Sequence, residues 1–143
     1  MILFINDDSV SYKLKNKRLI KSWIREIILS YKKETGEINY IFCSDRKILA
    51  INKEFLKHDY YTDIITFDYC NEQIINSDVF ISLDTVKSNS HLYKTPFIDE
   101  LHRVMIHGVL HLIGFKDKSK LDAEKMREAE NIALIRLKEM LSS

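Results

Sequence analysis

The segment from Phe97 to Ile113 restricts the fold of this chain more than any other part of the sequence. Thr95 and Pro96 precede it as a helix N-cap and a first-turn proline, and Gly114 follows it as a residue that commonly ends a helix. Apolar side chains occupy most of the helix circumference between these limits, and such a helix is stable when it is buried. The sequence therefore predicts a buried helix over residues 97–113.

The remaining segments predict an α+β fold. Gly36 is expected to end a first helix, Ser44 to cap a second one, and the turn-prone Asn71 and Asn76 to separate the two strands of a hairpin. Ser119 opens a last helix. The order of these elements predicts a small mixed four-stranded sheet with helices packed around it. The strand candidates are residues 2–6, 38–43, 62–69 and 77–83, and the helix candidates are residues 20–31, 45–55, a stretch after residue 84, 97–113 and 119–140.

The size and charge of the chain restrict its function. With 143 residues and 45% hydrophobic content, it is expected to form a single domain over residues 1–143. Its 22 basic and 21 acidic residues give a net charge of +1, so any RNA contact has to come from a local patch. No apolar run is long enough to span a membrane and no signal peptide is evident, so a cytoplasmic protein is predicted. Cys43 and Cys70 are expected to be reduced and buried, with a structural disulfide as the less favoured alternative.

His107 and His111 stand four residues apart within the predicted buried helix. Their side chains should therefore lie on one helix face, close enough to bind the same ion. Gly114 can take a left-handed conformation and reverse the chain, which would bring Asp117 back toward the two imidazoles. Imidazole and carboxylate are both good zinc ligands, and three protein ligands leave a fourth position for water. The spacing predicts a catalytic zinc-type site formed by His107, His111 and Asp117.

Two other interpretations of this spacing remain open. Paired histidines on an apolar helix can be hydrogen-bonded core residues, although a buried imidazole without a partner would cost about 1 to 3 kcal/mol. The spacing HxxxHxxGxxD is also similar to that of metzincin-type zinc peptidases, but Gly108 stands where those enzymes carry their glutamate base. A glycine in mid-helix suggests instead that something approaches the helix closely at this point.

The segment HGVLHLIGFKD, from His107 to Asp117, resembles the motif HGxLHLxGYDH of the YbeY family. The stretches INKEFLKHDYYTDIITFDY from Ile51 and SDVFISLDTV from Ser77 are similar to two further parts of that family, so the similarity spans roughly residues 40 to 135. Other residues that fit the family pattern are Glu100, Met126 and Glu130.

This resemblance implies a metal-dependent, single-strand-specific endoribonuclease that acts in ribosomal RNA maturation and ribosome quality control. One bound Zn²⁺, or another divalent metal, would polarise the phosphoryl oxygen or activate water, so that no covalent protein nucleophile is needed. RNA and the ribosome, or its small subunit, are then the expected partners. The alternatives are a zinc peptidase-like hydrolase and a non-catalytic ribosome-assembly factor with a structural metal.

Two positions depart from the family pattern. Asp117 occupies the place of the usual third histidine, which keeps a metal ligand but adds a negative charge. Leu56 occupies the place of an arginine that is thought to contact the RNA, so that role cannot be transferred to it. Lys57 and His58 are adjacent and are the candidate RNA-binding residues, although an exposed lysine in a loop is more often only solvated.

Hydrolysis also needs a proton acceptor, and Glu100 and Asp63 are the candidate catalytic acids. Glu100 lies seven residues before His107 near the same helix face, where it could orient an imidazole or only form a surface ion pair. Asp78 is a third acid that could accept the proton. Asp63 and Asp78 lie at the openings of two predicted strands, where a turn or capping role is the favoured interpretation.

Further RNA contacts could come from a basic face on the first helix and from three tyrosines. A solvated amphipathic face explains the same basic pattern and is the favoured interpretation. Tyr60, Tyr61 and Tyr69 could stack on bases, although aromatic residues near a strand are more often core residues. The basic residues of this face are Lys13, Lys15, Lys17, Arg18, Lys21 and Arg25.

Overall fold

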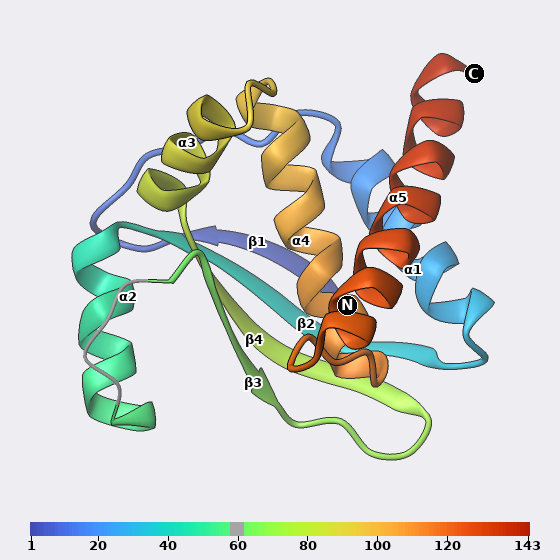
Figure 1. Cartoon of the computed structure of the whole chain (residues 1–143), viewed down its shortest axis with the longest axis horizontal. Coiled ribbons are helices and arrows are strands. Elements are labelled where there is room, and N and C mark those ends of the chain that lie inside the picture. The colour runs from blue at the N-terminus through green and yellow to red at the C-terminus, as the bar shows by residue number, and fades with distance from the viewer. Residues whose placement is uncertain (58–61) are drawn as a thin grey trace.

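The computed structural model describes residues 1–57 and 62–143, which form a four-stranded mixed sheet and the helices packed on it (Figure 1). The order of strands and helices and the fold class agree with the prediction. The strands are β1 (Ile2–Asn6), β2 (Glu34–Cys43), β3 (Ile64–Asp68) and β4 (Ile74–Ser82). The helices are α1 (Lys17–Ser30), α2 (Asp45–Ile51) with its π-helical continuation η1 (Asn52–Leu56), α3 (Leu83–Leu92), α4 (Phe97–Ile113) and α5 (Lys120–Ser142).

The sheet has the strand order β1-β2-β4-β3. β1, β2 and β4 are parallel to one another, and β3 pairs with β4 in the antiparallel hairpin that the sequence predicted. Asn71 lies in the hairpin turn, where its side chain accepts hydrogen bonds from the amides of Gln73 and Ile74. The carbonyl of Asp63 accepts a hydrogen bond from the amide of Ser82 at 2.9 Å, so Asp63 is held at the start of β3.

The two faces of the sheet are covered by different helices. A Cβ atom on Gly108 of α4 would come within 2.8 Å of the Ile64 side chain and 3.6 Å of Val79, so α4 lies directly on this face. The sheet is therefore what approaches the helix closely at Gly108, where the sequence predicted a close approach. Ile48 of α2 instead packs against Ile65. Because neighbouring residues of a strand point to opposite faces, α2 covers the other side.

Two buried hydrogen bonds fix the helices that carry the site. The indole nitrogen of Trp23 donates to the carbonyl of Ala133 at 2.8 Å, which ties α1 to α5. The hydroxyl of Tyr40 donates to the carbonyl of Met105 at 3.1 Å, which ties α4 to β2. α4 lies between α3 and α5 and contacts both (Figure 1). Across the described parts of the chain, no helix has both the length and the apolar character that a membrane span requires.

Two predicted helix boundaries are wrong. The first helix ends at Ser30 and not at Gly36, because Lys32 takes a left-handed conformation with a φ of 61° and reverses the chain four residues earlier. Gly36 lies within β2. At the start of α4, Pro96 and not Thr95 occupies the N-cap position, and no side chain caps the helix there. The caps predicted at the second and the last helix are confirmed, since the side chains of Ser44 and Ser119 accept hydrogen bonds from backbone amides at the helix starts.

Both cysteines are free thiols, as predicted. Cys43 is buried between the sheet and α2, where burial raises the pKa of its thiol to about 12. Cys70 is only partly buried, so the prediction of burial is wrong for this residue.

Candidate active site

A pocket of about 370 Å³ opens beside His107 where α3, α4 and α5 meet. Four acidic side chains line it together with the imidazole. Glu100 and His107 come from α4, and Glu130 comes from α5. Asp63, which precedes β3, and Asp117, which follows α4, complete the set. Segments that are far apart in the sequence therefore place one imidazole among four carboxyl groups.

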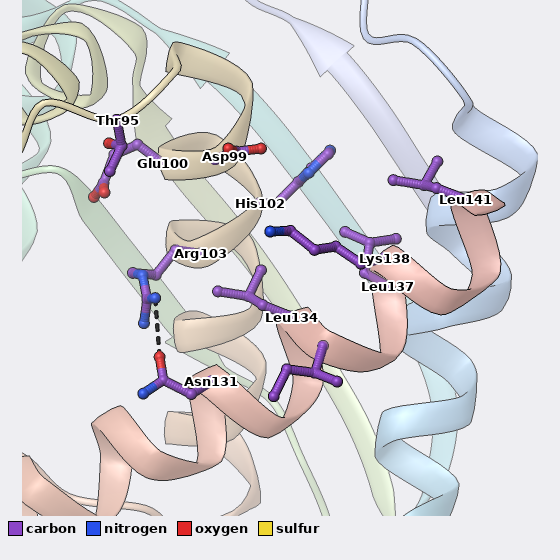
Figure 2. A pocket seen from close by; sticks show the side chains of 11 residues that line it. Thr95, Asp99, Glu100, His102, Arg103, Asn131, Leu134, Leu137, Lys138 and Leu141 are labelled. Atoms are coloured by element: carbon purple, nitrogen blue, oxygen red, sulfur yellow. Dashed lines mark hydrogen bonds between the residues drawn. The ribbon is translucent and has the colours of Figure 1, made fainter.

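Glu130 fixes the orientation of His107. One of its carboxylate oxygens lies 2.7 Å from Nδ1 of His107, and the other accepts a hydrogen bond from Arg103 at 2.8 Å. Arg103 is held in turn by Asn131, whose side-chain oxygen accepts its second hydrogen bond at 2.9 Å (Figure 2). Glu130 is only 6% exposed, so both of its oxygens depend on these partners. A buried carboxylate on one imidazole nitrogen leaves the other nitrogen, Nε2, directed at the pocket.

The electrostatics of this pair assign the imidazole tautomer. Burial alone would raise the pKa of Glu130, but the hydrogen bonds with His107 and Arg103 hold that pKa below its usual range. The hydrogen bond to Glu130 raises the pKa of His107, and burial opposes this effect. Because an ionised carboxylate can only accept, Nδ1 of His107 carries the proton. When the ring is neutral, Nε2 has a free lone pair.

The chain reversal after α4 brings Asp117 toward that lone pair. Gly114 ends the helix with a φ of 133°, a conformation that favours glycine, and the amides of Gly114 and Phe115 both bond to the carbonyl of Leu110. A carboxylate oxygen of Asp117 then lies 3.8 Å from Nε2 of His107. The reversal predicted at Gly114 is confirmed, and it brings these two predicted metal ligands together.

His111 lies one turn beyond His107 in the last turn of α4, and its side chain is exposed. It is not among the residues that line the His107 pocket. Within residues 1–57 and 62–143, no three histidine, cysteine, aspartate or glutamate side chains are gathered closely enough to hold an ion. The structure therefore brings together His107 and Asp117 but not His111.

The two candidate catalytic acids both line the pocket. Burial raises the pKa of Asp63, and the nearby His107 partly opposes the rise. Burial also raises the pKa of Glu100, with Arg103 opposing it. Asp78, the third acid considered, lies in β4, accepts a hydrogen bond from Asn39 at 3.0 Å and does not line the pocket.

Comparisons with known proteins identify the relatives of this chain. The sequence model of the family described as Endoribonuclease YbeY matches residues 4–138. The chain belongs to the YbeY family. The Endoribonuclease YbeY of Porphyromonas gingivalis is 52% identical over 136 residues, which are 95% of this chain and 90% of that protein. The Endoribonuclease YbeY of Bacteroides fragilis is 55% identical over 118 residues, which are 82% of this chain and 85% of that protein.

A solved structure agrees with the fold. The solution structure of TM1509 from Thermotoga maritima is similar to this chain with a TM-score of 0.65 and 26% sequence identity, covering 97% of this chain and 93% of that one. The YbeY membership inferred from HGVLHLIGFKD is thereby confirmed on the scale of the whole chain.

Of the two candidate RNA-binding residues, Lys57 lies within the described residues. Lys57 ends η1 with a φ of 55° and is exposed, but it does not line the His107 pocket. His58 lies outside the described residues, as do Tyr60 and Tyr61. The role of Lys57 in RNA binding stays a prediction.

A second hollow, of about 450 Å³, lies between α4 and α5 (Figure 2). It shares Glu100 and Arg103 with the His107 pocket, and much of the rest of its lining is aliphatic, including Leu134 and Leu137. Neither His107 nor Asp117 lines it. Although this hollow is larger, His107 and Asp117, two of the three ligand positions of the YbeY motif, line the other pocket, which we take as the candidate active site.

The contact between Glu130 and His107 was not predicted from the sequence. The prediction considered Glu100 for orienting an imidazole, but Glu130 makes that hydrogen bond. A signal was present, because Met126, Glu130, Ala133 and Leu137 recur at helical spacing and are all buried. A single acid within an apolar stripe needs a partner, and His107 and Arg103 provide it.

Proposed function

We propose that this chain is a metal-dependent endoribonuclease that cleaves single-stranded RNA in ribosomal RNA maturation and ribosome quality control. Membership of the YbeY family supports the RNA-cleaving activity. The observation that carries the proposal for the site is the line of side chains from Glu130 through His107 to Asp117. A metal-binding histidine usually donates a hydrogen bond from one ring nitrogen to a carboxylate and binds the metal through the other nitrogen.

A divalent cation fits between His107 and Asp117. Two zinc ligands that are each about 2.0 to 2.2 Å from the ion at tetrahedral angles are roughly 3.4 Å apart. The nearest oxygen of Asp117 is 3.8 Å from Nε2 of His107, so a small movement of the Asp117 side chain gives the ligand spacing. Four acids and two arginines line the pocket, and this excess of negative charge also favours a bound cation.

His107, His111 and Asp117 would hold one Zn²⁺ or another divalent ion. His111 lies on the same helix face as His107, and its exposed side chain would have to turn toward the ion. When bound, the ion polarises a phosphoryl oxygen and lowers the pKa of a bound water molecule. The exposed Asp117 and partly exposed His107 leave the site accessible to substrate and water, which favours a catalytic metal over a structural one.

Asp63 and Glu100 are the proposed proton-transfer groups. Burial raises the pKa of both carboxyl groups, so each binds a proton more readily than an exposed acid does. Groups of this kind can take a proton from the attacking water and return one to the leaving oxygen. The hydrogen bond between the Asp63 carbonyl and Ser82 keeps the first of them at the pocket edge.

The peptidase alternative lacks support at Gly108. That position has no side chain to act as the base, and the space that a side chain would need is taken by Ile64. A cytoplasmic location and binding to the ribosome or its small subunit remain part of the proposal, because both follow from ribosomal RNA as the substrate.

The activity can be tested with a labelled single-stranded RNA, the same RNA annealed to its complement, and a peptide panel. The single strand alone should be cleaved, and both a chelator and the His107→Ala substitution should abolish cleavage while the circular dichroism spectrum is retained. His91→Ala is the matched control, since His91 is an exposed histidine of α3 outside the pocket lining. Peptide hydrolysis with the RNA left intact, or RNA cleavage that resists chelator, would overturn the proposal.

A further inference from the structure

Tyr93 and Arg127 line the His107 pocket from two different helices. Tyr93 is the C-cap residue of α3, and Arg127 lies in the second turn of α5. Since α4 lies between these helices and supplies His107, one residue borders the site from the α3 side and the other from the α5 side (Figure 1).

The ring of Tyr93 is available for stacking. Tyr93 is 56% exposed, and within residues 1–57 and 62–143 its ring packs against no other aromatic ring. Its backbone is nevertheless fixed, because its amide bonds to the carbonyl of Asn89 at 2.9 Å and the amide of Thr95 bonds to the carbonyl of Ser90 at 2.9 Å. An exposed aromatic ring on a fixed backbone at a pocket rim is a suitable platform for a nucleobase.

Arg127 is available for a phosphate group. Its side chain is 58% exposed, and its closest approach to Glu130 is 3.8 Å, to an oxygen that already accepts a hydrogen bond from Arg103. Arg103 is different, because its guanidinium is bonded to both Glu130 and Asn131. Arg103 therefore supports the site, whereas Arg127 retains donors that can bind an anion bidentately.

We infer that the His107 pocket is a subsite for one unpaired nucleotide, whose base stacks on Tyr93 and whose neighbouring phosphate pairs with Arg127. The inference rests on the proposed function, because it names the part of the RNA that the site would hold. The pocket volume of about 370 Å³ suits one nucleotide rather than several. A base in a duplex has no free face, so stacking on Tyr93 requires a single strand.

The test measures binding of two labelled probes by fluorescence anisotropy, a 2′-O-methyl RNA trinucleotide and the same backbone without bases. Tyr93→Ala should weaken binding of the trinucleotide by about 5- to 100-fold, the usual contribution of one stacked base, and leave binding of the abasic probe unchanged. Tyr93→Phe should bind both probes as the wild type does. Leu92→Ala is the control, since Leu92 is 70% exposed at the end of α3, directly before Tyr93, but does not line the pocket.

The phosphate contact is tested on the same probes. Arg127→Gln should weaken binding of both probes equally and reduce the slope of log affinity against log salt by about 0.7, the value for one phosphate on a single strand. Arg136→Gln is the control, because Arg136 lies on the same helix, pairs with Glu26 and does not line the pocket.

The outcomes separate the subsite from the proposed function. If Tyr93→Ala weakens binding of the two probes equally, or of neither, the stacking subsite is refuted even when the wild type cleaves RNA. An unchanged salt slope in Arg127→Gln refutes the phosphate contact. If the trinucleotide shows the expected dependence on Tyr93 but the wild type cleaves no RNA, the subsite stands and the endoribonuclease proposal fails.

Discussion

At the scale of single residues, Glu130 is the site residue whose role the sequence alone did not predict. It lies in the buried stripe of α5, where an unpaired carboxylate would be unstable, and His107 and Arg103 stabilise it. The same hydrogen bond sets the tautomer of His107. One acid therefore contributes both to the stability of the fold and to the geometry of the proposed metal site.

The substitution Glu130→Gln tests both contributions. It keeps the shape of the side chain but removes the charge, so the free energy of unfolding should fall by about 1 to 3 kcal/mol in urea denaturation. Zinc affinity, measured by competition with a chelating dye, should fall about 10- to 100-fold, as expected when the partner of a metal-binding histidine is lost. Glu128→Gln removes an exposed acid from the same helix and should change stability by less than about 0.5 kcal/mol. Equal behaviour of the two variants would contradict the role given to Glu130.

The sequence predicted some site residues better than others for a physical reason. The helical spacing of His107 and His111 and the glycine before Asp117 are local features, and local geometry brought Asp117 to His107 as expected. The contact between Glu130 and His107 joins residues 23 positions apart and depends on how α5 packs on α4. Spacing within one helix carries no information about that packing.

At the scale of secondary structure elements, the main error concerned Gly36. Helical apolar spacing and β-rich runs predicted the order of the elements, because both patterns are local. The end of the first helix was misplaced because the prediction expected a glycine at the left-handed position, whereas Lys32 adopts that conformation. Gly36 instead lies in β2, at a shift of the register with β4. A Cβ atom there would be 2.1 Å from the side-chain oxygen of Asn76, which accepts a hydrogen bond from the amide of Glu37.

We expect Gly36→Ala to destabilise the protein without affecting the site. The added methyl group has to displace Asn76 and break its bond to Glu37, at a cost of about 1 to 3 kcal/mol in thermal or urea unfolding. In Asn76→Ala the clashing oxygen is absent, so adding Gly36→Ala to that variant should cost less than it does in the wild type. Strictly additive losses in the double variant would show that the contact with Asn76 is not the cause.

At the scale of the whole molecule, the site is a product of packing between distant segments. Asp63 precedes β3, His107 belongs to α4 and Glu130 to α5, and they meet because α4 lies on the sheet between α3 and α5 (Figure 1). Gly108 makes this arrangement possible by allowing α4 to approach β3 and β4 closely. Family resemblance located the motif in the sequence, but only the packed structure places Asp63, Tyr93 and Arg127 around it.

The central claim is that His107, oriented by Glu130, binds a divalent cation together with Asp117. The most direct measurement is elemental analysis of the purified protein beside its His107→Ala, His111→Ala and Asp117→Ala variants, with His91→Ala as the control. We expect one divalent metal ion per chain in the wild type and in His91→Ala, and little or none in the other three variants. Full metal content in His107→Ala, or a wild type that takes up no divalent metal when it is supplied, would contradict the claim.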